Sequence, residues 1–400
     1  MNHLWMRKKI GEICEIQNGF AFKSSDYTDD GYRVIRIGNV QNGKVVDKKP
    51  KYIPSGLINS FREFVLDNDD ILISLTGDVG RVGQIKNELL PAVLNQRVGR
   101  VKGINQNLID RDFLFRFLDS KGFEDLVIES AQGVAQKNTS TRKIKDIYLP
   151  IPPLPEQKRI VAKLDQAFEA IDKAKANVER NLQNAKDLFQ SQLNENFSQK
   201  RDGWENVKLS ELATDITDGD HMPPPKTKEG VPFITISNIN KENHQIDFTN
   251  TFTVSDEYYQ KLKEKRKPQK GDVLYTVTGS FGIPVVIEHD FKFCFQRHIG
   301  LIRPKKDLNS EWLYYWILSP QAILQANDTA TGTAQRTVSL TALRNFTIPR
   351  IPLKEQQIIV QELNTLSTEV RKLEYNYLQN IFDLDELKKS ILQKAFNGEL

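Results

Sequence analysis

Cysteine is scarce in this chain, since only Cys14 and Cys294 occur among 400 residues, and neither belongs to a CxxC motif. A disulfide framework and a cysteine-based zinc cluster are therefore excluded. The chain also lacks any run of roughly 18 apolar residues, and its charged beginning has no apolar stretch of a secretory signal. We therefore expect a cytoplasmic protein that does not enter a membrane.

Catalytic motifs are missing as well. Residues 38–44 (GNVQNGK) have the spacing of a phosphate-binding loop, but Val45 replaces the Ser or Thr that would hold Mg²⁺. The NPPY-type tetrapeptide of adenine methyltransferases is absent, and Cys294 and His298 have no further metal ligands nearby. We predict no catalytic residue and no metal site, which favours a binding protein over an enzyme.

The bulk composition is that of a globular protein. The hydrophobic fraction is 39%, the charged fraction is 27% and the mean hydropathy is −0.49. A length of 400 residues predicts two or three domains. The net charge of +4 permits nucleic-acid binding without requiring it.

The strongest feature is an internal repeat with an offset of about 199 residues. Five segments correspond in order: 34–40 (VIRIGNV) with 233–239 (FITISNI), 70–77 (DILISLTG) with 272–279 (DVLYTVTG), 95–97 (NQR) with 295–297 (FQR), 133–137 (GVAQK) with 332–336 (GTAQR), and 154–157 (LPEQ) with 353–356 (LKEQ). Chance does not keep five matches close to one offset, so the chain is a duplication.

Each half divides again at a proline cluster, at residues 150–155 and 349–352. Before the prolines, strand-like runs alternate with turn signals and with helical stretches at 112–128 and 310–326. After them, the pattern is helical. We predict an α+β fold with two mixed α/β domains at 1–150 and 201–349, followed by long spacer helices at 151–200 and 350–400.

The two expected helices carry apolar stripes with a seven-residue period. In the second helix one series is Leu363, Val370, Tyr377, Leu384 and Ile391, and the other is Ile359, Leu366, Leu373, Asn380 and Leu387. In the first helix the series are Leu164, Ile171, Val178 and Ala185, and Val161, Phe168, Leu182 and Phe189. We predict that the helices pack as an antiparallel coiled coil, in which Asn380 either fixes the register or lies partly exposed.

A polar, basic loop precedes each proline cluster. Residues 131–145 contain four cations and no acid, and residues 330–350 contain Arg336, Arg344 and Arg350, again without an acid. Gln and Arg can bond to base edges, while Ser, Thr, Lys and backbone N–H groups suit phosphates. One such loop would be an ordinary polar loop, but two at equivalent places favour nucleic-acid binding.

The same reasoning covers the repeated Gln-Arg pairs and the glycine turns after the central strands, although salt-bridged or core-facing pairs remain an alternative. The predicted DNA-binding residues are Thr76, Gly77, Arg81, Gln96, Arg97, Gln132, Gln136, Lys137, Asn138, Arg142, Lys143, Thr278, Ser280, Gln296, Arg297, Thr331, Gln335, Arg336 and Thr337. Residues 1–200 carry 31 basic and 26 acidic side chains, whereas residues 201–400 carry 25 and 26. Similar frames with different surfaces indicate two different target sequences.

Three segments resemble the specificity subunit of type I restriction-modification systems: 154–160 (LPEQKRI), 351–358 (IPLKEQQI) and the ending 387–400 (LKKSILQKAFNGEL). The resemblance implies two recognition domains that each read one half of a split sequence in double-stranded DNA, separated by helices that dock two methyltransferase subunits. It implies a non-catalytic subunit without a cofactor of its own. In such complexes the methyltransferase subunits use S-adenosylmethionine, and restriction subunits use ATP and Mg²⁺.

Two other functions would account for part of the sequence. A coiled-coil scaffold for proteins would explain the helices but not the two diverged domains with matching basic loops. A fused restriction or methylation enzyme would explain the duplication but requires motifs that are absent.

Overall fold

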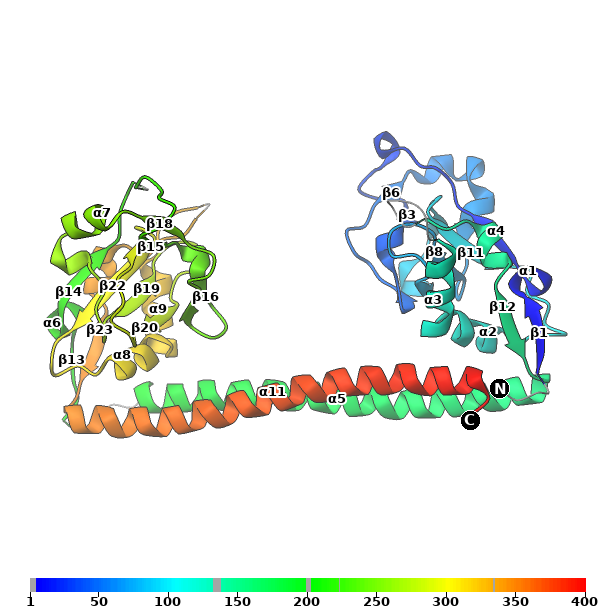
Figure 1. Cartoon of the computed structure of the whole chain (residues 1–400). Helices are drawn as coiled ribbons and strands as arrows, with labels where there is room; N and C mark the ends of the chain where they lie inside the picture. Colours follow the sequence, from blue (N-terminus) through cyan, green and yellow to red (C-terminus); the bar gives the residue numbers. More distant parts are fainter. Residues whose placement is uncertain (1–4, 132–137, 199–202, 223, 334) are drawn as a thin grey trace. The chain divides into compact units, whose positions relative to one another are not determined.

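The computed structural model describes residues 5–131, 138–198, 203–222, 224–333 and 335–400. The chain forms two compact units, of which unit 1 is Met1–Val178 with Gln379–Leu400 and unit 2 is Glu179–Leu378. Two helices of 45 residues, α5 (Leu154–Ser198) and α11 (Leu353–Asn397), contribute to both units. Each unit therefore combines one globular domain with a part of each long helix (Figure 1).

The domain of unit 1 is built on three sheets, with strand orders β2-β11-β8-β9-β5-β4, β6-β3-β10-β7 and β1-β12. Its strands are β1 (Met6–Lys9), β2 (Glu15–Asn18), β3 (Tyr32–Ile35), β4 (Val40–Gln41), β5 (Gly43–Val45), β6 (Tyr52–Ile53), β7 (Val65–Leu66), β8 (Ile71–Ser74), β9 (Val82–Gln84), β10 (Ala92–Leu94), β11 (Val98–Lys102) and β12 (Tyr148–Ile151). Its helices before α5 are α1 (Ile10–Ile13), α2 (Arg111–Leu118), α3 (Lys121–Ser130) and α4 (Thr141–Lys145), and its 3₁₀ turns are η1 (Ser24–Asp26), η2 (Ile37–Asn39), η3 (Ser55–Ser60), η4 (Arg62–Phe64) and η5 (Asn87–Leu89).

The domain of unit 2 has the strand orders β14-β22-β19-β20, β18-β15-β21, β16-β17 and β13-β23. Its strands are β13 (Glu205–Lys208), β14 (Ala213–Asp218), β15 (Val231–Ile234), β16 (Ile239–Asn240), β17 (Gln245–Ile246), β18 (Phe252–Val254), β19 (Val273–Thr276), β20 (Pro284–Val286), β21 (Cys294–Phe295), β22 (Ile299–Pro304) and β23 (Thr347–Arg350). Its helices before α11 are α6 (Leu209–Leu212), α7 (Asp256–Lys261), α8 (Ser310–Ile317), α9 (Pro320–Thr329) and α10 (Leu340–Arg344), with η6 (Ile236–Asn238) and η7 (Glu264–Arg266).

The repeat is confirmed at the level of strand pairing. The buried strand β8 pairs antiparallel with β9 and β11, and its counterpart β19 pairs antiparallel with β20 and β22. The parallel pair β3 and β10 corresponds to the parallel pair β15 and β21. In both domains the first strand pairs antiparallel with the strand that enters the long helix, β1 with β12 and β13 with β23.

The two helical stretches expected at 112–128 and 310–326 are each two helices. Ser120 accepts a hydrogen bond from the N–H of Phe123 and begins α3, and Ser319 accepts one from the N–H of Ala322 and begins α9. A serine in this role satisfies a free N–H of the new helix and favours a break in the chain direction. The predicted helical character of both stretches is confirmed, and a serine divides each of them at the same place in the two domains.

The long helices are part of each unit's core. In unit 1, Leu164, Phe168 and Ile171 of α5 are buried, and Phe396 of α11 packs edge-on against Phe113 of α2, with ring centroids 5.3 Å apart. In unit 2 the roles are exchanged, because Phe197 of α5 packs edge-on against Trp312 of α8, with centroids 5.7 Å apart.

The first predicted seam series holds in both helices. Leu363 and Val370 are buried, and Val178, Tyr377, Leu384 and Ile391 are half-buried. In the second series of α5, Phe168 is buried and Leu182 and Phe189 are half-buried. The expected coiled-coil pairing is confirmed, with α5 and α11 side by side (Figure 1).

The second series predicted for α11 holds at its start, where Ile359 is buried and Leu366 is half-buried, and is wrong from Leu373 onward. The side chains of Leu373 and Leu387 are 40% and 46% exposed, and Asn380 is exposed. In this later part the less exposed positions lie one residue further along, at Ile381 and Ala395, which follow the first series by four residues instead of three. In α5 the two series are also four residues apart, as Leu164 and Phe168 show. Transferring the α5 series to α11 by the 199-residue offset would therefore have given the correct stripe.

Each long helix is fastened to its domain by a buried glutamine. The side chain of Gln157 accepts a hydrogen bond from the Asp110 N–H (2.7 Å) and donates to the carbonyls of Leu108 (3.0 Å) and Pro152 (2.8 Å). Gln356 repeats this in unit 2, accepting from the Asn309 N–H at 2.7 Å. It donates to the carbonyls of two further residues, Asp307 and Ile351. The Glu-Gln motif after the prolines is thus a structural anchor.

Among the described residues no helix is both long and apolar enough to cross a bilayer.

Candidate nucleic-acid interface

The glycine turn that follows the central strand is held by a buried hydroxyl in both domains. The Ser74 hydroxyl donates to the Asp78 carbonyl (2.5 Å) and accepts from the Arg81 N–H (3.0 Å). Thr276 repeats the arrangement with the Ser280 carbonyl (2.8 Å) and the Ile283 N–H (3.0 Å). Gly77 and Gly279 have φ values of 75° and 71°, a backbone conformation that favours glycine. The turn is therefore pre-shaped before any ligand binds.

The predicted loop segments lie on the two sides of this turn. The Leu75 N–H donates to the Arg97 carbonyl (2.9 Å), and the Leu75 carbonyl accepts from the Thr139 N–H (2.9 Å). In unit 2 the Val277 N–H donates to the His298 carbonyl, and the Val277 carbonyl accepts from the Val338 N–H. Three segments that are distant in sequence thus form one continuous surface in each domain.

The Gln-Arg turn is also held against the segment that directly follows β2 in unit 1 and β14 in unit 2. The Gln96 N–H donates to the Phe20 carbonyl at 2.8 Å, and the Arg297 N–H donates to the Asp220 carbonyl at 3.0 Å. The preceding Gly19 and Gly219 pass so close that an added Cβ would lie 2.3 Å from the Asn95 oxygen or 1.9 Å from the Phe295 oxygen. Both glycines are required by this close approach.

In unit 1 the predicted residues differ in how free their side chains are. Gln96 and Arg97 are exposed, and in the described part of the chain no carboxylate lies within 4 Å of the Arg97 guanidinium. Arg81, by contrast, forms an ion pair with Asp78 at 2.8 Å. Thr76 forms a bridge with Asn138 beside the exposed Gly77.

Two further cations of unit 1 belong to α4 and are exposed. Arg142 and Lys143 follow the helix cap Ser140, and the Lys143 ammonium donates to the Ser130 carbonyl at 2.5 Å. Gln132, Gln136 and Lys137 lie outside the described residues.

In unit 2 the predicted residues surround the turn in the same way. Thr278 and Thr337 bridge each other, with their hydroxyl oxygens 3.3 Å apart, and Thr337 also bridges Thr331. Arg336 is exposed, donates to the Asn327 carbonyl (2.5 Å) and lies over the Phe281 ring. These contacts fix where its charge is presented.

The Gln-Arg turn of unit 2 combines a half-buried and an exposed side chain. Gln296 is half-buried, and the exposed Arg297 has its Nε 3.4 Å from the Nε2 of His298.

A shallow hollow of ≈ 270 Å³ lies at this surface of unit 2. Its polar lining includes Thr278, Ser280 and Gln335, and also Ser237, Lys241 and His298. The last three were not predicted from the sequence as site residues. Partial burial, and then the charge of Arg297, lower the pKa of His298 below its usual value, so the imidazole is mostly neutral near pH 7.

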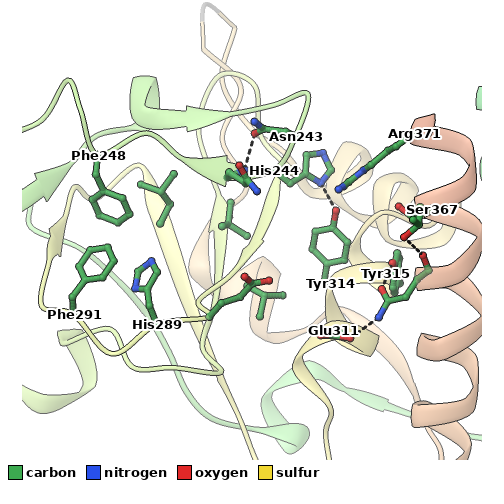
Figure 2. A pocket seen from close by; sticks show the side chains of 17 residues that line it. Asn243, His244, Phe248, His289, Phe291, Glu311, Tyr314, Tyr315, Ser367 and Arg371 are labelled. Carbon is green, nitrogen blue, oxygen red and sulfur yellow. Dashed lines mark hydrogen bonds between the residues drawn. The ribbon is translucent and has the colours of Figure 1, made fainter. Parts of the chain in front are cut away.

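A larger hollow of ≈ 470 Å³ lies in unit 2 between the domain and α11 (Figure 2). His244 Nδ1 is 2.8 Å from the Tyr314 hydroxyl on its wall, and His289 stacks on Phe291 with ring centroids 3.6 Å apart. Asn364 and Arg371 of α11 form the opposite wall. None of the predicted DNA-binding residues lines it.

Across the described residues no group of three or more His, Cys, Asp or Glu side chains is placed to hold a metal ion. The chemistry of the three-segment surface is that of hydroxyl, amide, guanidinium and backbone N–H donors. Such donors bind phosphate oxygens and base edges.

Comparison with known proteins agrees with this duplicated surface. The family model described as the type I restriction modification DNA specificity domain matches residues 2–180 and again residues 201–381. The chain belongs to the type I restriction-modification DNA specificity family. The two matches contain the two globular domains and most of both long helices of this specificity protein.

Relatives match the specificity chain over nearly its whole length or over part of it. The EcoBI specificity subunit of Escherichia coli is 27% identical over 424 residues, covering 99% of this chain and 86% of the relative. The MjaVIII specificity subunit of Methanocaldococcus jannaschii is 31% identical over 183 residues, which is 44% of this chain.

Solved structures share the fold of this specificity protein. A chain from a study of complex assembly and conformational transition in a type I R-M system has a TM-score of 0.75 at 21% identity, covering 100% of this chain and 99% of its own. The HsdS subunit from Thermoanaerobacter tengcongensis has a TM-score of 0.59 at 23% identity, covering 100% and 98%.

Proposed function

We propose that this chain is the non-catalytic DNA specificity subunit of a type I restriction-modification complex, and that each domain reads one half of a bipartite site in double-stranded DNA. One observation carries the proposal. The strand-end turn, the Gln-Arg turn and the basic loop form the same hydrogen-bonded surface in both domains, while side chains beside the shared Gln-Arg pair differ, such as Asp78 against Ser280 and Asn138 against Thr337.

The exposed side chains of this surface suit two kinds of contact. The guanidinium of Arg97 or Arg297 and the amide of Gln96 or Gln335 can bond to base edges in the major groove. Threonine hydroxyls and the N–H groups of the glycine turns suit phosphate oxygens. Sequence reading and positioning would thus be shared between neighbouring parts of one surface.

The long helices are proposed to set the gap between the two half-sites and to dock two methyltransferase subunits. A helix of 45 residues is about 68 Å long at a rise of roughly 1.5 Å per residue. In the assembled complex, S-adenosylmethionine would be bound by the methyltransferase subunits, and ATP with Mg²⁺ by restriction subunits, so that this chain supplies specificity alone.

A pair of matched substitutions tests the proposal. Arg97→Ala and Arg297→Ala, each in the assembled methyltransferase complex, are expected to relax the recognised sequence at one half-site only, at a cost of about 1 to 3 kcal/mol. The recognised sequences are determined by methylating a library of random DNA and sequencing the modified molecules. Loss of methylation at both half-sites together, or no change for either variant, would contradict independent reading by the two domains.

A further inference from the structure

Two ion pairs join the long helices in unit 1. The Lys175 ammonium lies 2.7 and 2.8 Å from the two carboxylate oxygens of Asp385, and the Lys388 ammonium lies 2.9 and 3.2 Å from those of Asp172. Three residues back along α5, from Lys175 to Asp172, correspond to three residues forward along α11, from Asp385 to Lys388. The helices are therefore antiparallel, and the charged pairs mark their register.

The repeat transfers these positions to unit 2 with the charges exchanged. The 199-residue offset relates Lys175 to Glu374 and Asp385 to Lys186. The same antiparallel register places Lys186 opposite Glu374, although within the described residues their charged groups are not within 4 Å of each other. At this pair of positions α5 thus carries a lysine twice, and α11 carries an acid twice.

The apolar stripe does not discriminate between partners in this way. Because α5 and α11 are copies of one pattern, the stripe alone would also allow α5 to pair with α5 of a second chain, and α11 with α11. The first arrangement would place Lys175 against Lys186 of the second copy. The second would place Glu374 against Asp385 of the second copy.

A third position acts against self-pairing of α11. The offset relates Asp172 to Arg371 and Lys388 to Phe189, so unit 2 lacks the second ion pair of unit 1. Arg371 instead points toward His244 and Tyr314 (Figure 2), and within the described residues no carboxylate lies within 4 Å of its guanidinium. Two copies of α11 in this register would bring Arg371 against Lys388.

We propose that these charges select the partner of each half of the protein: residues 1–200 pair with residues 201–400, and pairing of either half with a second copy of itself is disfavoured. Opposite charges across a helix seam favour the mixed pair, and like charges oppose both self-pairs. If the proposed DNA function holds, the consequence is an asymmetric site, because a self-paired half would read the same half-site twice.

The test uses the full chain, cut after folding. A protease recognition sequence is inserted between Ser198 and Gly203, and purified protein is cleaved in two batches, one of which carries ¹⁵N throughout. The batches are mixed in urea at a concentration just sufficient for the halves to exchange partners. Pairs that contain one light and one heavy half show that exchange has occurred. The mixture is then returned to buffer. Native mass spectrometry counts the mixed pairs and the two kinds of self-pair.

Random association would make self-pairs as abundant as mixed pairs. We expect self-pairs to be reduced at least roughly tenfold below that level, since several charge pairs of modest individual strength act together. Self-pairs at the random level would overturn the proposal. The readout contains no DNA, so its failure is distinguishable from failure of the proposed recognition function.

A charge exchange provides the matched control. The double variant Lys175→Asp with Asp385→Lys keeps an ion pair within the chain but makes the corresponding contacts of both self-pairs attractive. Its self-pairs are expected to rise several-fold over those of the unaltered protein. If both proteins gave mixed pairs alone, the selection would have a cause other than these charges, and the proposal would fall.

Discussion

Replacing the buried anchor Gln157 by alanine is expected to destabilise unit 1 and leave unit 2 intact. The side chain is fully buried and makes three hydrogen bonds, one from the Asp110 N–H and two to the carbonyls of Leu108 and Pro152. The variant leaves these three backbone groups without a partner. At about 1 kcal/mol for each lost bond, the free energy of unfolding of unit 1 should fall by about 3 kcal/mol.

A glutamate at the same position separates hydrogen bonding from packing. Gln157→Glu preserves the volume and one acceptor, but it replaces the NH₂ group with an oxygen that faces two carbonyl oxygens. It should destabilise at least as much as alanine, because the second oxygen of a buried, charged carboxylate would have no donor and would face two carbonyl oxygens. The exposed Gln166→Ala on the same helix serves as a control and should change little.

The assay is hydrogen–deuterium exchange with mass spectrometry across a urea series, since it reports on the two units separately. The Gln157 variants should raise exchange in α2, β12 and the start of α5, and Gln356→Ala should do so in α8, β23 and the start of α11. A Gln157→Glu protein as stable as the original would refute the reasoning. Equal effects of Gln157→Ala on both units would also refute it, since the hydrogen bonds are confined to unit 1.

Two more predictions concern single side chains. Burial raises the pKa of Asp119 to about 7, against a hydrogen bond from the Gly43 backbone and the nearby Arg116. A raised pKa means that the folded state holds the proton more tightly, so stability should fall as pH rises from about 4 to about 7. Asp119→Asn should therefore be more stable than the original protein by about 2 kcal/mol at pH 8, a value discounted for partial exposure, and equally stable at pH 4. Urea unfolding at both pH values checks this. A stability difference that does not depend on pH would contradict it. Thr276→Val removes the hydroxyl that holds the turn of unit 2 and should lower the free energy of unfolding by about 2 kcal/mol. Thr276→Ser keeps the hydroxyl and should lower it much less. Urea unfolding followed by tryptophan fluorescence measures both, and equal losses for the two variants would show that the methyl group matters instead.

The sequence predicted the frame of the fold well because duplication doubles every signal. Two domains, two long helices and the first seam series follow from residues that occur twice at one offset. The later part of the second seam series of α11 was wrong because Leu373 and Leu387 are apolar, yet the face buried by a helix is decided by its partners. Applying the offset to Leu182 would have indicated the half-buried Ile381 instead of the exposed Asn380.

The interface was only partly predictable. The glycine turns and Gln-Arg pairs were visible as repeated motifs, but their joining depends on strand pairing between residues far apart, such as Leu75 with Arg97 and Thr139. The hydroxyls of Ser74 and Thr276 were missed because a small buried polar residue resembles any strand residue. Lys241 and His298 had no repeated signal that could have identified them.

The central claim is that this chain confers DNA sequence specificity, and mapping of DNA methylation tests it most directly. DNA from cells that express this chain with its methyltransferase subunit is sequenced for N6-methyladenine, beside DNA from cells with the methyltransferase subunit alone. The account predicts a gapped, asymmetric sequence methylated on both strands only when this chain is present. An assembled complex that is supplied with S-adenosylmethionine and yet produces no new methylated sequence would contradict it.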